Sequence, residues 1–222
     1  RVNNLIRLEN LNINLKNNKL LIGNINIFIP SGCIVSIIGK PASGKTKLFN
    51  IIGLKEKANA GNLYILGKNT NKLDRNEVSS LHKEISLVSE SNDLIYNLGV
   101  KENIILPLIA GNKGKDEVEI AINELVSWLK IDMILKKETF VLSRYEQKMV
   151  QFARAIITRP RILLLDNFFL NLDSDLQKKI SYLLLALKKI GTTIVAFNAD
   201  ISSPLLEYTE VYKIQNSGLV KI

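Results

Sequence analysis

Gly39-Lys40-Pro41-Ala42-Ser43-Gly44-Lys45-Thr46 fits the pattern G-x-x-x-x-G-K-[ST] at every fixed position. The stretch follows an apolar run, Cys33–Ile38, typical of a fully buried strand. It precedes Leu48, Ile51 and Ile52, whose spacing predicts a helix. In a strand–loop–helix unit of this kind the glycines let backbone N–H groups point inward at phosphate oxygens, and the helix contributes its positive end. A chance glycine turn is the alternative, and the flanking strand and helix argue against it.

Two side chains of this stretch have expected roles. Lys45 would reach the β- and γ-phosphates of a nucleotide, and the Thr46 hydroxyl would ligate Mg²⁺. Such a site needs an aspartate at the end of a second buried strand, and Asp166 follows the apolar run 162–165. Asp166 would hold the Mg²⁺ shell through water, although an aspartate there could also simply cap the next turn.

The remaining pattern is that of an α/β protein. Residues 11–15 and 25–29 alternate apolar and polar side chains, which predicts half-exposed antiparallel strands. The buried strands expected at 162–165 and 193–197 are separated by a helix from about 174 to 190, which favours a largely parallel sheet. Gly191 stands where that helix would end in a left-handed residue.

A segment from about 93 to 137 interrupts this alternation. It carries a helical stripe of apolar residues, Val118, Ala121, Ile122, Leu125 and Leu129, with charged residues on the opposite face. This pattern predicts a helical subdomain inserted in the α/β core, with Trp128 in its core. His82, the only histidine, lies in a charged segment and is expected to be exposed. Short strands at 211–214 and 219–222 predict an edge hairpin.

The composition excludes several classes of protein. A hydrophobic share of 46% with 23% charged residues is enough for a buried core and argues against disorder. The single cysteine, Cys33, excludes an internal disulfide framework and a cysteine-built zinc site, and it favours a reducing compartment. No apolar run approaches the roughly 18–20 residues of a membrane span.

The net charge of +9 favours an anionic partner, which could be a nucleotide, a nucleic acid or an acidic membrane face. Lysines and arginines are dispersed and form no basic stripe interleaved with aromatic residues. Nucleic acid is therefore not an expected partner.

The order of these elements resembles the ATP-binding subunit of an ABC transporter. Leu142-Ser143-Arg144-Tyr145-Glu146-Gln147 lies where that family has its LSGGQ-type signature, and Phe152–Ile156 resembles the helix after it. Asp166 and the run Asn171-Leu172-Asp173 resemble the Walker B aspartate and the D-loop.

The resemblance covers nearly the whole chain and implies the ABC type of P-loop NTPase fold. That fold has a mostly parallel core sheet, an N-terminal antiparallel β portion and an inserted helical subdomain. Residues 1–222 would form one ATP-binding domain, with its core at about 1–92 and 155–222 and its helical subdomain at about 93–154. The implied ligands are ATP and Mg²⁺, with phosphates held by residues 39–46.

Within the family the chain resembles most the compact FtsE, LolD and MacB group. Arg75–Val78, Gly99–Ile104 and Leu106–Leu108 carry this likeness. FtsE, the cell-division member, is the nearer match, and a LolD-type role stays open. The resemblance implies a head-to-tail dimer in which each phosphate loop faces the partner's signature, where Ser143 is retained. It also implies an integral membrane subunit, FtsX-like or a permease, docked near the helical subdomain, and a place on the cytoplasmic face of the plasma membrane.

Two binding positions depart from the family pattern. Leu15 stands where an aromatic residue would stack on adenine, and losing such a stack weakens binding by roughly 5- to 150-fold. Glu90 stands at the Q-loop glutamine position. It keeps an oxygen ligand for the metal but adds a charge, which could strengthen Mg²⁺ binding or repel nucleotide.

Two catalytic positions depart as well. Asn167 replaces the glutamate expected to act as general base, and an amide can orient water but cannot take its proton. General-base assistance is worth roughly 10²–10⁴ in rate. The switch histidine falls on Ala199, or on Asn198 if the alignment shifts by one residue, and neither supplies an imidazole.

The signature glycines are replaced by Arg144 and Tyr145. Their side chains should obstruct the approach of backbone N–H groups to the γ-phosphate across the dimer, although Arg144 could provide a cationic contact instead.

Two functions follow from an intact loop beside altered catalytic positions. The first is an ATP-binding subunit that hydrolyses ATP weakly or not at all and serves a membrane partner as a nucleotide-gated scaffold or switch. The alternative is an active ABC ATPase that drives transport or cell-division signalling, which requires Asn167 or solvent to support slow turnover. The dimer could be formed with a second copy or with another ABC subunit. In such a dimer each ATP site combines the Walker motifs of one chain with the signature of the other. A partner with intact motifs would therefore restore each site only in part.

Overall fold

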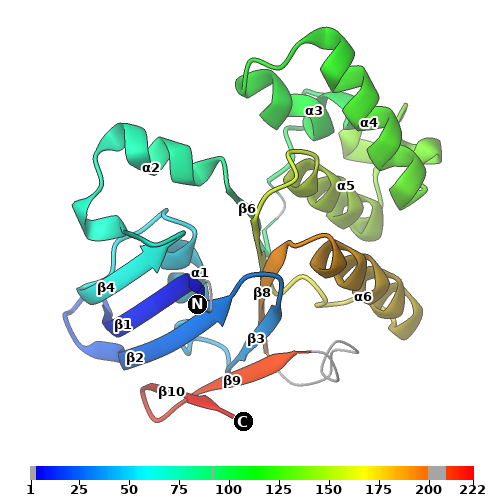
Figure 1. The fold of residues 1–222 in the computed structure, drawn as a ribbon. Coiled ribbons are helices and arrows are strands. Elements are labelled where there is room, and N and C mark those ends of the chain that lie inside the picture. Colours follow the sequence, from blue (N-terminus) through cyan, green and yellow to red (C-terminus); the bar gives the residue numbers. More distant parts are fainter. Residues whose placement is uncertain (1–3, 92, 200–208) are drawn as a thin grey trace. The chain divides into compact units, whose positions relative to one another are not determined.

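The computed structural model describes residues 4–91, 93–199 and 209–222 (Figure 1). The chain divides into two compact units. The core unit contains Arg1–Leu87 and Arg161–Ile222, and the helical unit contains Val88–Pro160.

One sheet of the core unit is antiparallel. β1 (Asn4–Asn14) lies between β2 (Leu20–Pro30) and β4 (Ala60–Ile65), and β5 (Lys68–Asn69) pairs with β4. The alternation predicted for the first two strands is confirmed, because Leu11, Ile13 and the isoleucines of β2 point into the core. Leu15 is the exception. The chain turns directly after Asn14, which leaves Leu15 outside the strand and 39% exposed.

The second sheet is mostly parallel, as predicted. Its order among the described strands is β10-β9-β3-β8-β7-β6. The bounds are β3 (Ile34–Ile38), β6 (Ile85–Val88), β7 (Ile162–Asp166), β8 (Thr193–Asn198), β9 (Glu210–Gln215) and β10 (Gly218–Lys221). β8 is parallel to β3 and β7, β9 is parallel to β3, and β10 forms the predicted antiparallel edge hairpin with β9. All residues of β3, β7 and β8 are buried, as their continuous apolar runs predict.

Helices complete the core unit. α1 (Lys45–Ile52) packs against β7 and β8, where the Phe49 ring meets Phe197 edge-on with centroids 5.7 Å apart. α6 (Ser174–Lys189) packs against β8 and is followed by Gly191 with the predicted left-handed φ of 101°. α2 (Arg75–His82) follows the short helix η1 (Thr70–Lys72), and His82 is exposed as predicted. No helix among the described residues has the length and hydropathy of a membrane span.

The helical unit contains α3 (Val100–Ala110), α4 (Lys115–Leu129) and α5 (Arg144–Ile156), with the short helices η2 (Asp132–Ile134) and η3 (Thr139–Val141) between α4 and α5. α3 packs against both α4 and α5. The buried residues of α4 follow helical spacing, but the prediction that Trp128 lies in the core is wrong. Trp128 is 40% exposed because it lies outside the buried face of α4. The buried residues of that face are spaced three or four apart and are Val118, Ile122, Val126 and Leu129.

Candidate functional site

The loop between β3 and α1 has the shape of a phosphate cradle. Ala42 and Gly44 both have left-handed backbone, with φ of 61° and 101°. Such turns direct successive N–H groups toward one point. A Cβ on Gly44 would lie 2.8 Å from Ile22 Cδ1, and one on Gly39 would lie 2.5 Å from Ser43 Oγ. Glycine at position 44 is therefore favoured by φ, and at both positions a larger residue would displace neighbouring side chains.

Lys45 is folded back over this loop. Its side chain is 6% exposed, and Nζ donates to the Gly39 carbonyl at 2.6 Å and to the Lys40 carbonyl at 3.0 Å. A buried ammonium must be compensated, and here the first two residues of the loop compensate it. The loop thus fixes the positive charge of Lys45 beside its own backbone.

Thr46 and Asp166 meet although 120 residues separate them in the chain. Thr46 Oγ1 donates to Asp166 Oδ2 at 3.1 Å, and Asp166 is 2% exposed at the end of β7. A hydroxyl and a carboxylate at this spacing are the hard oxygen ligands that Mg²⁺ prefers. In the described part of the chain no three His, Cys, Asp or Glu side chains form a metal cluster, so these residues suit an ion that takes its other ligands from water and phosphate.

Asn167 has an unusual backbone conformation. Its φ is 47°, its N–H donates to the Phe197 carbonyl at 2.8 Å, and its own carbonyl accepts from the Leu170 N–H at 3.0 Å. Asparagine tolerates left-handed backbone better than most residues, and glutamate does not share that tolerance. The residue that departs from the family pattern is therefore the one that this backbone favours.

The end of β8 faces the same loop. Ala199 is exposed and lines a cavity of about 660 Å³ together with residues 38–43, Leu21 and residues 213–217. Asn198 instead points into the sheet, where Nδ2 donates to Ser36 Oγ at 3.3 Å, while its carbonyl accepts from the Gly39 N–H at 3.2 Å. Of the two candidate switch positions, Ala199 is the one that borders the cavity.

The turn between β1 and β2 approaches the start of α1. The Leu15 N–H donates to the Lys19 carbonyl at 2.8 Å, which closes the turn. Lys47, in the first turn of α1, donates from Nζ to the Asn14 carbonyl at 3.1 Å. Sequence reasoning missed Lys47 because its partner is 33 residues away and only the fold brings the two together.

The signature segment begins α5 in the helical unit. Ser143 is the N-cap: its Oγ accepts from the Glu146 N–H at 3.2 Å, and Glu146 Oε2 accepts from the Ser143 N–H at 2.8 Å. Lys137, which donates to Glu146 Oε1 at 2.7 Å, and then the Ser143 N–H lower the pKa of Glu146. The spacing S-x-x-E is that of a capping box, a signal that could have predicted this arrangement. Arg144 is exposed at the first helical position.

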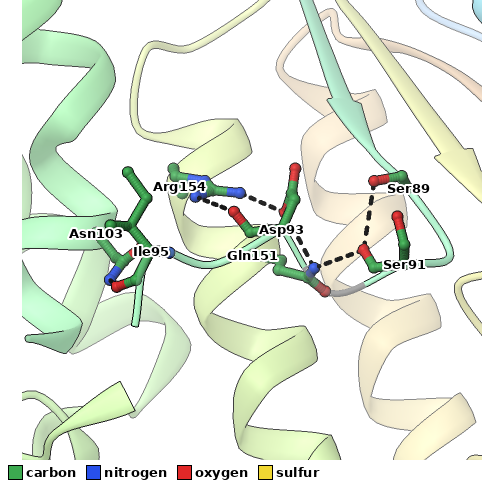
Figure 2. A network of polar contacts seen from close by, with 7 residues as sticks. All are labelled: Ser89, Ser91, Asp93, Ile95, Asn103, Gln151 and Arg154. Atoms are coloured by element: carbon green, nitrogen blue, oxygen red, sulfur yellow. Dashed lines mark hydrogen bonds and ion pairs between the residues drawn. The ribbon is translucent and has the colours of Figure 1, made fainter. Parts of the chain in front are cut away.

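The segment after β6 carries Glu90 and is fastened to α5 within the helical unit (Figure 2). Gln151 Nε2 donates to the Ser91 carbonyl at 3.1 Å and to Asp93 Oδ1 at 3.0 Å. Arg154 forms an ion pair with Asp93 and also donates to its carbonyl at 3.2 Å. Sequence analysis did not anticipate this network, whose members are 58 to 61 residues apart.

Glu90 itself is exposed, and its charge acts on Lys148 of α5. Burial lowers the pKa of Lys148, and the carboxylate of Glu90 works against that shift. Thr46 and Asp166 belong to the core unit, while Glu90 and Ser143 belong to the helical unit. The contribution of Glu90 to a metal site stays a prediction.

Arg154→Ala is expected to lower the free energy of unfolding by about 1–2 kcal/mol. The substitution removes the ion pair with the Asp93 carboxylate and the hydrogen bond to the Asp93 carbonyl. The Arg154 side chain is 15% exposed, so solvent screens it little, although Asp93 is 47% exposed. Urea denaturation measures the loss.

The matched control for that experiment is Arg159→Ala. Its ion pair with Glu124 joins side chains that are 79% and 59% exposed, and such surface pairs contribute almost nothing. Equal losses for the two variants would show that the Asp93 network does not hold the segment.

Comparison with known proteins identifies the family. The family profile described as "ABC transporter" matches residues 22–169, which include the phosphate loop, the signature segment and Asp166. The chain belongs to the ABC transporter family. It is an ATP-binding domain of that family, as the sequence predicted.

Two relatives illustrate the group. The chain is 32% identical to the lipoprotein-releasing system ATP-binding protein LolD of Aquifex aeolicus over 192 residues, which are 86% of this chain and 85% of the relative. It is also 32% identical to the cell division ATP-binding protein FtsE of Haemophilus influenzae over 184 residues, 80% of this chain and 82% of the relative. Equal identity supports the predicted FtsE, LolD and MacB group and favours neither member.

Solved structures agree with the fold. A dimeric ATP-binding cassette in a post-hydrolysis state, bound to ADP and Pi, superposes with a TM-score of 0.86 at 29% identity over 96% of both chains. The predicted ABC-type fold, with its antiparallel N-terminal sheet and mostly parallel second sheet, is therefore confirmed for this cassette.

Proposed function

We propose that this cassette is the nucleotide-gated subunit of a membrane-associated ABC complex, and that it binds Mg-ATP but hydrolyses it weakly or not at all. One observation carries the proposal. The core unit keeps the folded loop with Lys45 and the Thr46–Asp166 contact, while the next residue, Asn167, has no group that can accept a proton from water.

The binding half of the proposal rests on these contacts. Pro41 has no N–H, and the N–H groups of Gly39 and Ser43 donate to the carbonyls of Asn198 and Lys40. The other N–H groups of the loop and the Lys45 ammonium would hold the β- and γ-phosphates. Thr46 and Asp166 would hold Mg²⁺, which neutralises charge on the phosphates to which it binds. The Thr46 hydroxyl that would ligate the ion and the Asp166 carboxylate that would hold its water shell already lie 3.1 Å apart.

The weak-hydrolysis half rests on Asn167. An amide can orient a water molecule by hydrogen bonding, but it does not act as a base at neutral pH. Loss of general-base assistance costs roughly 10²–10⁴ in rate. Ala199, at the switch position, provides no imidazole to compensate. The alternative, an active ATPase that drives transport or division signalling, requires solvent or Asn167 to suffice.

Partners are proposed on two grounds. Several large apolar side chains of the helical unit are exposed, among them Met133 at 87%, Phe140 at 68% and Ile109 at 54%. We assign these exposed side chains to contact with an integral membrane subunit, FtsX-like or a permease. A head-to-tail dimer, with a second copy or another ABC subunit, is supported by the dimeric cassette of similar fold. This assembly would lie at the cytoplasmic face of the plasma membrane.

The decisive experiment combines calorimetric titration of the full chain with Mg-ATP and a phosphate-release assay on the same sample. Saturable binding with little phosphate release is the expected result. Binding with sustained release would favour the active ATPase instead. No heat of binding up to millimolar ATP would overturn the proposal.

Asp166→Asn tests the metal assignment. Removing the carboxylate charge should reduce Mg²⁺ affinity by about 10- to 100-fold, so that Mg²⁺ enhances ATP binding much less than in the wild type. Titrations with and without Mg²⁺ measure the ratio. Asp175→Asn is the control, because its side chain is 92% exposed. An unchanged Mg²⁺ dependence in Asp166→Asn would remove Asp166 from the site.

A further inference from the structure

We propose that this site recognises the triphosphate chain by charge and does not discriminate the nucleotide base. The inference deepens the proposed function, because it names the class of ligand that the same site would take. It rests on what surrounds the phosphate loop in the core unit.

Among the residues that the structure describes, those lining the cavity beside the loop include no aromatic ring. The β1–β2 turn that approaches α1 consists of Leu15, two lysines and two asparagines. The lining of the cavity beside the loop contains aliphatic, small and amide side chains with Lys40 and Lys213, and includes neither an aromatic residue nor a histidine. Phe49 of α1 is 1% exposed and packs on Phe197, so its ring is unavailable. A base would therefore find no stacking platform here.

Lysine side chains, and not an aromatic ring, lie at the start of α1 and in the β1–β2 turn. Lys47 is partly buried, and the Asn14 carbonyl, 3.1 Å from Nζ, holds its ammonium between the turn and the start of α1. An ammonium has three N–H donors, and this carbonyl uses one of them. Lys47 lies two residues after Lys45, so the first turn of α1 carries two ammonium groups. Lys16 and Lys19 add exposed charge in the adjacent turn.

Charge recognition differs from base recognition in what it can distinguish. The phosphate chain is common to every nucleoside triphosphate and to inorganic triphosphate, so lysines and backbone N–H groups bind all of them alike. Where an aromatic ring is present, stacking of the base on it raises the binding affinity by roughly 5- to 150-fold. The ratio of ATP affinity to inorganic triphosphate affinity therefore measures base recognition directly.

The test titrates the full chain with the Mg²⁺ complexes of ATP, GTP, CTP and inorganic triphosphate. Wild-type dissociation constants are expected to agree within about threefold. Leu15 is exposed, and Leu15→Tyr should lower the dissociation constants of ATP and GTP by about fivefold or more. The dissociation constant of inorganic triphosphate should not change. Leu15→Ile is the matched control and should change none of the four.

Lys47 is tested in the same titrations. Lys47→Ala should weaken all four ligands by one common factor, about three- to tenfold, and should reduce the dependence of binding on salt. Lys57→Ala, an exposed lysine beyond α1, should have no effect.

The outcomes separate this inference from the proposed function. ATP binding that is tenfold or more tighter than binding of inorganic triphosphate would overturn the inference and leave ATP binding intact. An unchanged ligand ratio in Leu15→Tyr would also overturn it, because Leu15 would then not face a base. Failure of all four ligands to bind would overturn both.

Discussion

Lys45→Ala should weaken Mg-ATP binding by about 100-fold or more. Nζ supplies charge-assisted hydrogen bonds from inside the loop, and each such bond contributes about 1.5–3 kcal/mol. Nothing else in the loop carries a buried positive charge: Lys40 is exposed. Calorimetric titration of the full chain gives both dissociation constants.

Two controls make that result interpretable. Lys57→Ala removes one exposed lysine and should bind Mg-ATP like the wild type, which excludes an effect of net charge. Lys45→Met keeps the apolar stem and should lose binding as Lys45→Ala does, which excludes an effect of packing. Retained affinity in both Lys45 variants, with normal thermal unfolding, would show that the loop does not bind phosphate.

Restoring glutamate at position 167 should raise ATP hydrolysis, provided the signature is restored as well. The combined variant Arg144→Gly, Tyr145→Gly and Asn167→Glu is expected to hydrolyse ATP about 10²- to 10⁴-fold faster than the wild type. The glycines remove the side chains that would obstruct the partner's phosphate. Phosphate release at saturating Mg-ATP measures the rate.

The matched control carries the same glycines with Asn167→Gln. Glutamine has the length of glutamate but no proton-accepting carboxylate, so this variant should stay near the wild-type rate. Both variants should lose stability at position 167, by about 1–2 kcal/mol, because φ there is 47°. Equal rates in the two variants, with ATP bound, would show that position 167 is not the base position.

Much of the core unit could be predicted because its signals are local. Alternation in β1 and β2, continuous apolar runs in β7 and β8, and the spacing of the loop glycines each act within a few residues. The Thr46–Asp166 contact could also be anticipated, since parallel strands place their carboxyl ends at one edge of the sheet.

Other features depend on contacts that no local pattern encodes. Asp93, Gln151 and Arg154 come together only because the segment after β6 crosses α5, and Lys47 finds Asn14 only because β1 ends beside α1. The core position predicted for Trp128 is wrong because a large apolar side chain beside a buried helical stripe does not always join it. The left-handed backbone at Asn167 is likewise a property of the turn after β7.

That turn has a consequence for timing. In a cassette with an effective general base, ATP hydrolysis ends the ATP-bound state. The rate of hydrolysis then sets how long that state lasts. With Asn167 favoured by its backbone and unable to take a proton, the bound state would end when the nucleotide dissociates. Occupancy would then follow the balance between dissociation constant and ATP concentration, so the proposed switch would report the energy supply of the cell instead of consuming it.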